Sequence, residues 1–177
     1  MGKILVGLCM VLLEFNINLE TAVIGLIPDF IGYILLVMGL KEMVSESGFF
    51  QKSIPLSAGM AVYSAVCYLL DLLGITGVYD FILGMINTAC FFYILYLMIK
   101  GIEEMQTKSG KNLYTDNLNS IWLCLLVLYA GAYLLLFIPI LSSICIISGS
   151  VATIILVWYI YKAKEEYYKK NIEIGGQ

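Results

Sequence analysis

Residues 25–39 read GLIPDFIGYILLVMG, and this run decides the fold because it places one acidic residue inside an otherwise apolar stretch. Similar apolar runs recur along the chain, and 61% of its 177 residues are hydrophobic. That composition lies outside the usual range for soluble globular domains. Since roughly 20 apolar residues suffice to cross a bilayer as a helix, we expect residues 25–39 to belong to a membrane-spanning helix.

The basic residues are sorted along the chain. All ten are lysines, and they fall in alternate gaps between the apolar runs, whereas the other gaps hold only acids. Membrane insertion retains lysine in short cytoplasmic loops, so this pattern predicts six spans with both termini in the cytoplasm. In chain order the lysines are Lys3; Lys41 and Lys52; Lys100, Lys108 and Lys111; and Lys162, Lys164, Lys169 and Lys170. The intervening acids are Glu14, Glu20, Asp71 and Asp80.

The predicted fold is an all-α, polytopic integral membrane bundle that occupies residues 1–177 as a single domain. Short outer connections make consecutive helices neighbours, so the six transmembrane helices should form three antiparallel hairpins. We expect longer polar loops on the inner side, over residues 41–53 and 100–119. The predicted spans are residues 4–18, 22–40, 54–73, 81–99, 120–137 and 140–161.

Three glycines recur at seven-residue intervals in the second predicted span: Gly25, Gly32 and Gly39. On a helix they fall within about 40° of one another. Small residues on one helix face allow another backbone to approach closely in a membrane. This glycine stripe therefore predicts a helix-packing surface.

Pro28 and Asp29 allow two geometries. In the first, the helix begins at Pro28, Asp29 lies in its first turn at the positive end of the dipole, and residues 21–27 are irregular or re-entrant. In the second, a kinked helix runs from Ala22 and places Asp29 about 10 Å below its start. Either geometry puts a carboxylate beside open backbone groups, as at ion and substrate sites of transporters. Asp29 is therefore the main candidate for contact with a ligand or ion.

The fourth predicted span supplies three further candidates: Asp80, Asn87 and Thr88. Asp80 and Asn87 share one helix face, and Thr88 lies beside it. Asp80 is either a helix N-cap or a cation contact. An amide in mid-span needs a partner in hydrocarbon, so Asn87 either bonds another helix or contacts a ligand.

No catalytic constellation is recognised, and we do not expect an enzyme. The chain has no histidine, so a serine or cysteine nucleophile would need lysine or aspartate as its base, and every lysine lies outside the predicted spans. No phosphate-binding glycine loop, zinc motif or haem attachment motif occurs. The sequence therefore predicts no cofactor, no metal and no nucleic-acid partner.

These observations favour transport, or the binding of a small solute, cation or amine from the outer face. The alternative is a non-catalytic membrane partner or accessory subunit that packs through its glycine stripe. The absence of arginine and histidine, with abundant lysine, isoleucine, tyrosine and asparagine, suggests a bacterial source with an AT-rich genome. The expected location is the bacterial plasma membrane, crossed several times, with the lipid bilayer as the main partner.

Residues 27–35, IPDFIGYIL, preceded by FNIN at residues 15–18, resemble a group of small uncharacterised integral membrane proteins of Firmicutes that carry an LPDFIGYIL-like segment. The resemblance covers about 30 residues and implies location and kinship, but no activity. By size and topology alone, the chain is also similar to the substrate-binding subunits of energy-coupling-factor vitamin transporters. Those proteins show an AxxxA packing motif in their first span, whereas here Ala61 and Ala65 supply that spacing in the third.

Overall fold

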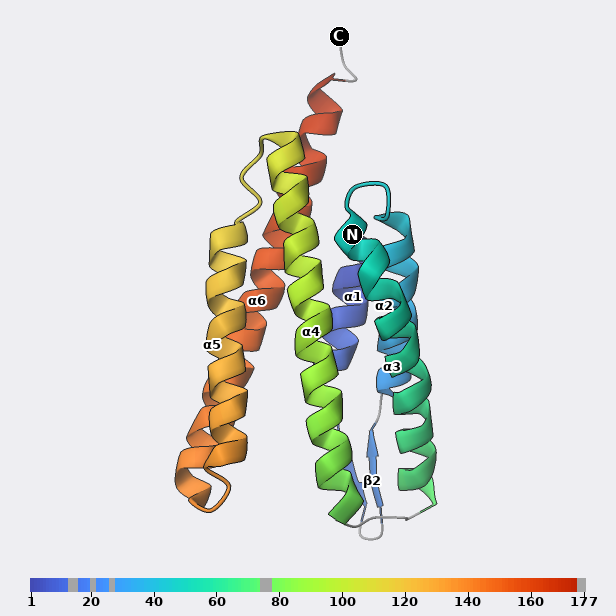
Figure 1. Ribbon diagram of the computed structural model, residues 1–177, viewed down its shortest axis with the longest axis vertical. Helices are drawn as coiled ribbons and strands as arrows, with labels where there is room; N and C mark the ends of the chain where they lie inside the picture. The colour runs from blue at the N-terminus through green and yellow to red at the C-terminus, as the bar shows by residue number, and fades with distance from the viewer. Residues whose placement is uncertain (13–15, 20–21, 26–27, 74–77, 175–177) are drawn as a thin grey trace. The chain divides into compact units, whose positions relative to one another are not determined.

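The computed structural model describes residues 1–12, 16–19, 22–25, 28–73 and 78–174 (Figure 1). Over these residues the chain forms six helices and one two-stranded antiparallel hairpin, joined by turns and short connections. The helices are α1 (Gly2–Leu12), α2 (Asp29–Glu42), α3 (Gly48–Leu72), α4 (Val78–Ser109), α5 (Thr115–Leu134) and α6 (Pro139–Ile174). The strands are β1 (Asn16–Leu19) and β2 (Ala22–Gly25).

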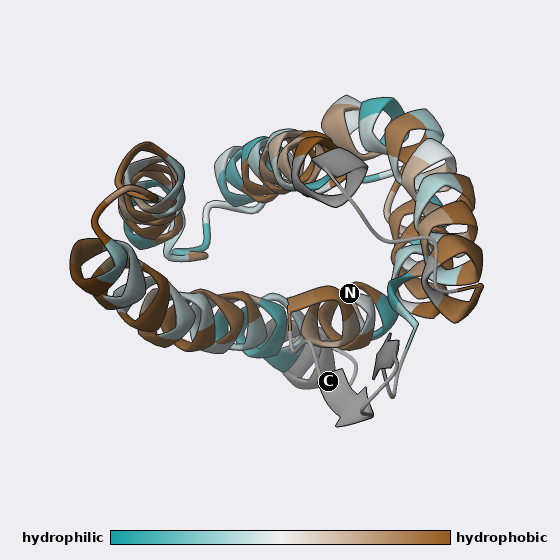
Figure 2. Cartoon of the chain, turned by 90° about the horizontal axis from the view of Figure 1, so that it is seen from below, coloured by the Kyte–Doolittle hydropathy of each residue, from teal (hydrophilic) through white to brown (hydrophobic). Residues whose placement is uncertain are grey.

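Four of the described helices are long and apolar enough to cross a membrane. The qualifying segments are Gly48–Leu70, Ile82–Ser109, Thr115–Leu134 and Pro139–Lys169. Helix α1 is also apolar but shorter. Figure 2 shows hydrophobic residues along each of the long helices, and many of their large apolar side chains are exposed. Length, composition and exposed apolar surface together suit these helices to contact with lipid.

The chain divides into two compact units, Met1–Gly101 and Ile102–Gln177. The first contains α1, the hairpin, α2, α3 and most of α4, and the second contains the end of α4 with α5 and α6. Whether one membrane domain covers residues 1–177 stays a prediction, as do the six-span topology and the sides on which the termini lie.

The hairpin corrects the first two predicted spans, 4–18 and 22–40. Strand β1 pairs with β2 from Asn16 opposite Gly25 to Leu19 opposite Ala22, so these residues are extended where helix was expected. Proline lacks a backbone donor and disfavours helical geometry in the preceding residue, which prevents α2 from extending backwards through Pro28. Of the two predicted geometries, the broken one is observed, although α2 begins at Asp29 and Pro28 is its N-cap rather than its first residue.

Helices α1 and α2 pack closely through glycine. A Cβ placed on Gly7 would lie 2.7 Å from the Gly32 carbonyl oxygen and 2.8 Å from the Leu36 amide nitrogen. One placed on Gly39 would lie 2.6 Å from the Ile4 amide nitrogen. The predicted packing surface therefore exists, but its partner is α1 of the same chain.

Gly25 does not belong to that surface, because it is the last residue of β2 and lies outside α2. The helical stripe consists of Gly32 and Gly39, and Gly7 completes it from α1. Where the start of α1 lies beside the end of α2, the Lys3 ammonium contacts the Glu42 carboxylate at 2.5 Å.

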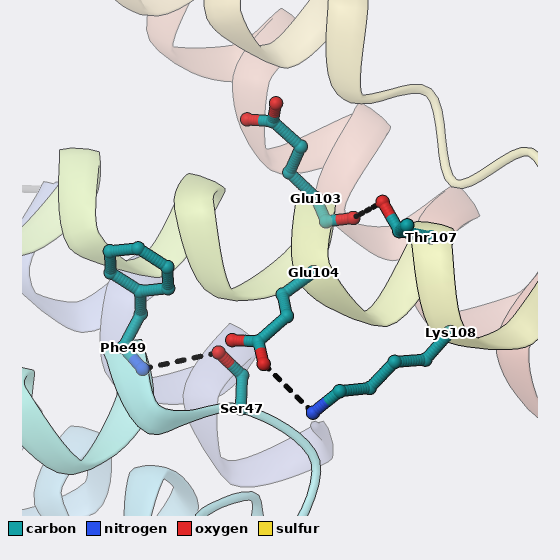
Figure 3. A network of polar contacts seen from close by, with 6 residues as sticks. All are labelled: Ser47, Phe49, Glu103, Glu104, Thr107 and Lys108. Atoms are coloured by element: carbon teal, nitrogen blue, oxygen red, sulfur yellow. Dashed lines mark hydrogen bonds and ion pairs between the residues drawn. The ribbon is translucent and has the colours of Figure 1, made fainter.

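The polar segments 41–53 and 100–119, predicted as loops, are largely helical. Helix α3 already begins at Gly48, where the Ser47 hydroxyl accepts the Phe49 N–H at 3.1 Å (Figure 3). Helix α4 continues to Ser109, supported by the Glu104–Lys108 ion pair at 2.8 Å. A change to polar residues indicates where a helix would leave the membrane, but it does not indicate where the helix ends. Helix α4 ends just before Gly110, whose φ of 64° favours glycine.

In the second unit, α5 and α6 form an antiparallel helical hairpin. Near their connection the Ser142 hydroxyl donates to the Ala132 carbonyl oxygen at 3.1 Å. At the far end the Asn117 amide donates to the Tyr159 hydroxyl at 3.3 Å.

Replacing Gly7 by alanine should lower the free energy of unfolding by about 1–3 kcal/mol, because backbone atoms of α2 occupy the space that the methyl group needs. Gly59→Ala is the matched control, since nothing lies within 4 Å of a Cβ there. It should be neutral or stabilise by about 0.5–1 kcal/mol. Thermal unfolding of both variants in one detergent measures the difference, and equal melting temperatures would contradict the packing.

The Lys3–Glu42 pair should make stability depend on pH. The hydrogen bond that the Lys3 ammonium donates to the Glu42 carboxylate lowers the pKa of that carboxyl below its ordinary value of 4.5. A lowered folded-state pKa stabilises the protein above pH 4.5, and this contribution is lost as the pH falls through the folded-state pKa. Lys3→Gln should therefore melt earlier than the parent at pH 7 and low salt, and the gap should close in acid. A gap unchanged by pH would show that the pair contributes nothing.

Candidate functional site

Asp29 is the first residue of α2 and follows directly on the helix break. Pro28 precedes it with extended backbone angles, φ −63° and ψ 129°. The first turn carries unpaired N–H groups and the positive end of the helix dipole, both of which favour a carboxylate. The Asp29 side chain is half-buried in the first unit. The structure thus places the main candidate at the position that the broken geometry predicted.

One helical turn further along α2 lies Tyr33, whose side chain is 0% exposed. Residues four apart share a helix face, so Tyr33 continues the face on which Asp29 begins. Its hydroxyl donates to the Asn87 side-chain oxygen on α4 at 3.2 Å. Asn87 therefore makes an interhelical hydrogen bond, one of the two roles predicted for it.

Helix α3 brings further polar groups to this level of the first unit. The rings of Phe30 and Tyr68 meet edge to face with centroids 6.0 Å apart, which fixes how α2 runs past α3. Ser64, one turn back from Tyr68, consequently lies at about the level of Tyr33, since α2 and α3 run in opposite directions. Beside it, the Tyr63 hydroxyl donates to the Leu83 carbonyl oxygen of α4 at 2.9 Å. We call Tyr33, Tyr63, Ser64 and Asn87 the polar layer.

Two serines on the buried face of α3 make no hydrogen bond among the described residues. Ser57 is 0% exposed and Ser64 is 8% exposed, and neither side-chain oxygen has a partner. They lie seven residues apart and so share a face. A buried hydroxyl without a partner costs about 1–3 kcal/mol. By contrast, the nearby Ser53 hydroxyl is satisfied by the Phe49 carbonyl oxygen at 2.9 Å. The hydroxyls of Ser57 and Ser64 are thus the buried polar groups of α3 that no hydrogen bond among the described residues satisfies.

The remaining predicted residues of α4 have different positions. The Thr88 hydroxyl donates to the Gly84 carbonyl oxygen at 2.9 Å, within its own helix. Asp80 is the third residue of α4, which begins at Val78. Its side chain lies outside the described residues, as do those of Glu14, Glu20 and Asp71. Of the four predicted candidates, the structure thus relates Asp29 and Asn87 to each other, through Tyr33.

Sequence reasoning missed the polar layer residues of α2 and α3. Tyr33 could have been found, because it lies one turn after Asp29 and three residues before the fully buried Leu36. For Ser64 no local signal distinguishes a satisfied from an unsatisfied hydroxyl, because the difference depends on which helix packs against it. Among the described residues, no group of three cysteine, aspartate or glutamate side chains could hold a metal ion.

The fold supports the class of helical membrane proteins. The part of the chain that the structure describes has four apolar helices of spanning length, and its first unit holds the polar layer, in which Tyr33 and Ser64 are buried. Comparison with protein-family models, with curated proteins and with solved structures found no match to this chain.

The Tyr33–Asn87 hydrogen bond can be measured with a double-mutant cycle. Tyr33→Phe should lower the free energy of unfolding by about 0.5–1.5 kcal/mol, because it leaves a polar atom of Asn87 without its partner. Combining it with Asn87→Leu should show a coupling of similar size. Tyr93→Phe is the control, since that residue is 56% exposed. Additive effects of the two substitutions would contradict a bond between these side chains.

Proposed function

We propose that this chain is a six-span protein of the bacterial plasma membrane that binds a small cation or amine from the outer face, as a transporter or a solute-binding membrane protein. The alternation of lysines and acids along the chain supports cytoplasmic termini and an acidic outer face. The hairpin and the start of α2 then lie towards the outer side.

The observation that carries the proposal is the break before α2. Helices α1 and α2 have 11 and 14 residues, which gives lengths of about 16 and 21 Å. Each is shorter than the roughly 30 Å hydrocarbon core, so the hairpin would complete both crossings. Non-helical backbone is tolerated at membrane depth where it is buried in protein or lines a water-filled cavity. Broken helices of this kind form the binding sites of secondary transporters.

The chemistry near the break suits a hard, monovalent cation or a protonated amine. Asp29 supplies a half-buried carboxylate. One turn further along α2, the Tyr33 hydroxyl supplies a neutral oxygen, and the Asn87 side-chain amide on α4 supplies another. The hydroxyl already donates a hydrogen bond to the amide oxygen. Ser64 adds a buried hydroxyl oxygen at that level. A carboxylate with neutral oxygens is the ligand type that such cations prefer.

The alternative role as an accessory subunit loses its main support. It required the glycine stripe to be free for another chain, but Gly32 and Gly39 are buried against α1. No other observation favours a protein partner over a solute.

The proposal is tested by cation-dependent stabilisation of the purified protein. A ligand that binds the folded state at 100 times its Kd stabilises it by about 2.7 kcal/mol. Melting temperatures are compared in choline chloride and in equal concentrations of lithium, sodium, potassium and methylammonium chloride. We expect one of these cations to raise the melting temperature, and Asp29→Asn to abolish that rise.

Asp116→Asn is the matched control, because Asp116 is also a carboxylate in the first turn of a helix but is exposed on α5. It should leave the cation-dependent rise unchanged. A rise that survives Asp29→Asn, or the absence of any difference among the cations, would overturn the proposal.

A further inference from the structure

One face of α6 combines a long apolar stripe with a charged end. The stripe recurs every three or four residues, so it follows one side of the helix, and its side chains are exposed along its whole length. We call these residues the α6 stripe: Ile140, Ile144, Ile147, Val151, Ile154 and Trp158. From Pro139 to Tyr161 the helix carries no charged residue, a distance of about 35 Å at the rise of an α-helix. The stripe therefore has the length of a lipid-facing surface.

The charges begin where the stripe ends, and they continue on the same face. Lys162 lies one turn after Trp158, and its ammonium nitrogen is 3.9 Å from the centroid of a Trp158 ring. It also lies 5.6 Å from the centroid of the ring of Tyr114, the N-cap residue of α5. Glu165 follows three residues later and is exposed. Side chains on a helix point back towards its N-terminus, so Lys162 reaches the level of the tryptophan and Glu165 reaches the level of Lys162.

Tryptophan rings collect at the interface between hydrocarbon and water, and Trp158 is 49% exposed. The surface thus presents an ordered series: apolar side chains, an amphipathic ring, a cation and then an anion. That order matches a phospholipid whose zwitterionic headgroup ends in an ammonium group: acyl chains, glycerol, phosphate and finally ammonium. A purely anionic lipid would match it less well, because two acids, Glu165 and Glu166, lie between Lys164 and Lys169.

We propose that this surface binds an aminophospholipid. The acyl chains lie along the α6 stripe, Lys162 contacts the phosphate, and Glu165 contacts the ammonium group. The two aromatic rings hold Lys162 in place, which limits the side-chain entropy lost when the phosphate binds. The site lies within the second unit, so it is independent of the cation site proposed around Asp29.

The test uses purified full-length protein in detergent micelles doped with dioleoyl phosphatidylethanolamine, phosphatidylglycerol or phosphatidylcholine, with matched acyl chains. Lipid retention is measured by native mass spectrometry. We expect at least threefold more phosphatidylethanolamine than either other lipid on the parent protein. Lys162→Gln should reduce retention of phosphatidylethanolamine several-fold.

Glu165→Gln separates the two headgroup contacts. It removes the partner of the ammonium group while leaving Lys162, so phosphatidylethanolamine should lose its advantage and phosphatidylglycerol should equal or exceed it. Lys52→Gln is the control, because Lys52 also stacks on an aromatic ring, that of Phe49 at 5.2 Å, on a different helix; it should change nothing. Equal retention of all three lipids, a preference of the parent for phosphatidylglycerol, or an unchanged preference in Glu165→Gln would overturn the proposal.

Discussion

The structure depends on the requirement that backbone N–H and C=O groups find hydrogen-bond partners wherever water is excluded. Helices α3 to α6 meet it within themselves, which is why long apolar segments of each can face lipid. The chain departs from this solution at Pro28, where an extended segment replaces helix. Strands β1 and β2 satisfy each other along one edge, and β2 also lies against α3. A two-stranded ribbon still has outer edges, so its surroundings must be protein or water rather than lipid chains.

The break is possible because the two helices beside it are held by close backbone contact. A helix of 11 residues is marginal by itself. Helix α1 is stabilised by its approach to α2, where Gly7 faces Gly32 and the backbone of Ile4 faces Gly39. Such contacts bring many atoms into dispersion range without burying polar groups. The Lys3–Glu42 contact closes the pair at its charged end. Thus the two short helices act as one packed hairpin, although neither reaches across a bilayer alone.

Much of this arrangement could be read from the sequence, for identifiable physical reasons. Apolar length predicted the long helices, and the chemistry of Pro28 allowed two starts for α2, of which the helix break beside the proline is the observed one. The hairpin was not predicted, because each of its strands, Asn16–Leu19 and Ala22–Gly25, is only four residues long, and their pairing is visible only in the folded structure. The continuation of α4 to Ser109 was missed because polar residues indicate where a helix would leave the membrane. They do not indicate where its backbone hydrogen bonds end. The partner of the glycine stripe could not be predicted either, because the close contact of Gly7 with α2 is known only once the two helices are seen to pack.

Of the polar layer, only Asn87 was a candidate from the sequence, and the residues that were missed change its chemistry. Asn87 alone suggested an amide seeking any partner; with Tyr33 it is a pair whose hydrogen bond is already made. A cation at the proposed site would therefore compete with the Tyr33–Asn87 hydrogen bond for these oxygens. This competition favours selectivity among cations over tight binding. Among the described residues of the first unit, the buried hydroxyls without a hydrogen-bond partner lie on α3 instead, at Ser57 and Ser64. Strength must then come from the Asp29 carboxylate, whose charge acts over a longer range than neutral oxygens do. On the proposed function, the acid at the helix break attracts the cation, and the layer one turn below decides which cation remains.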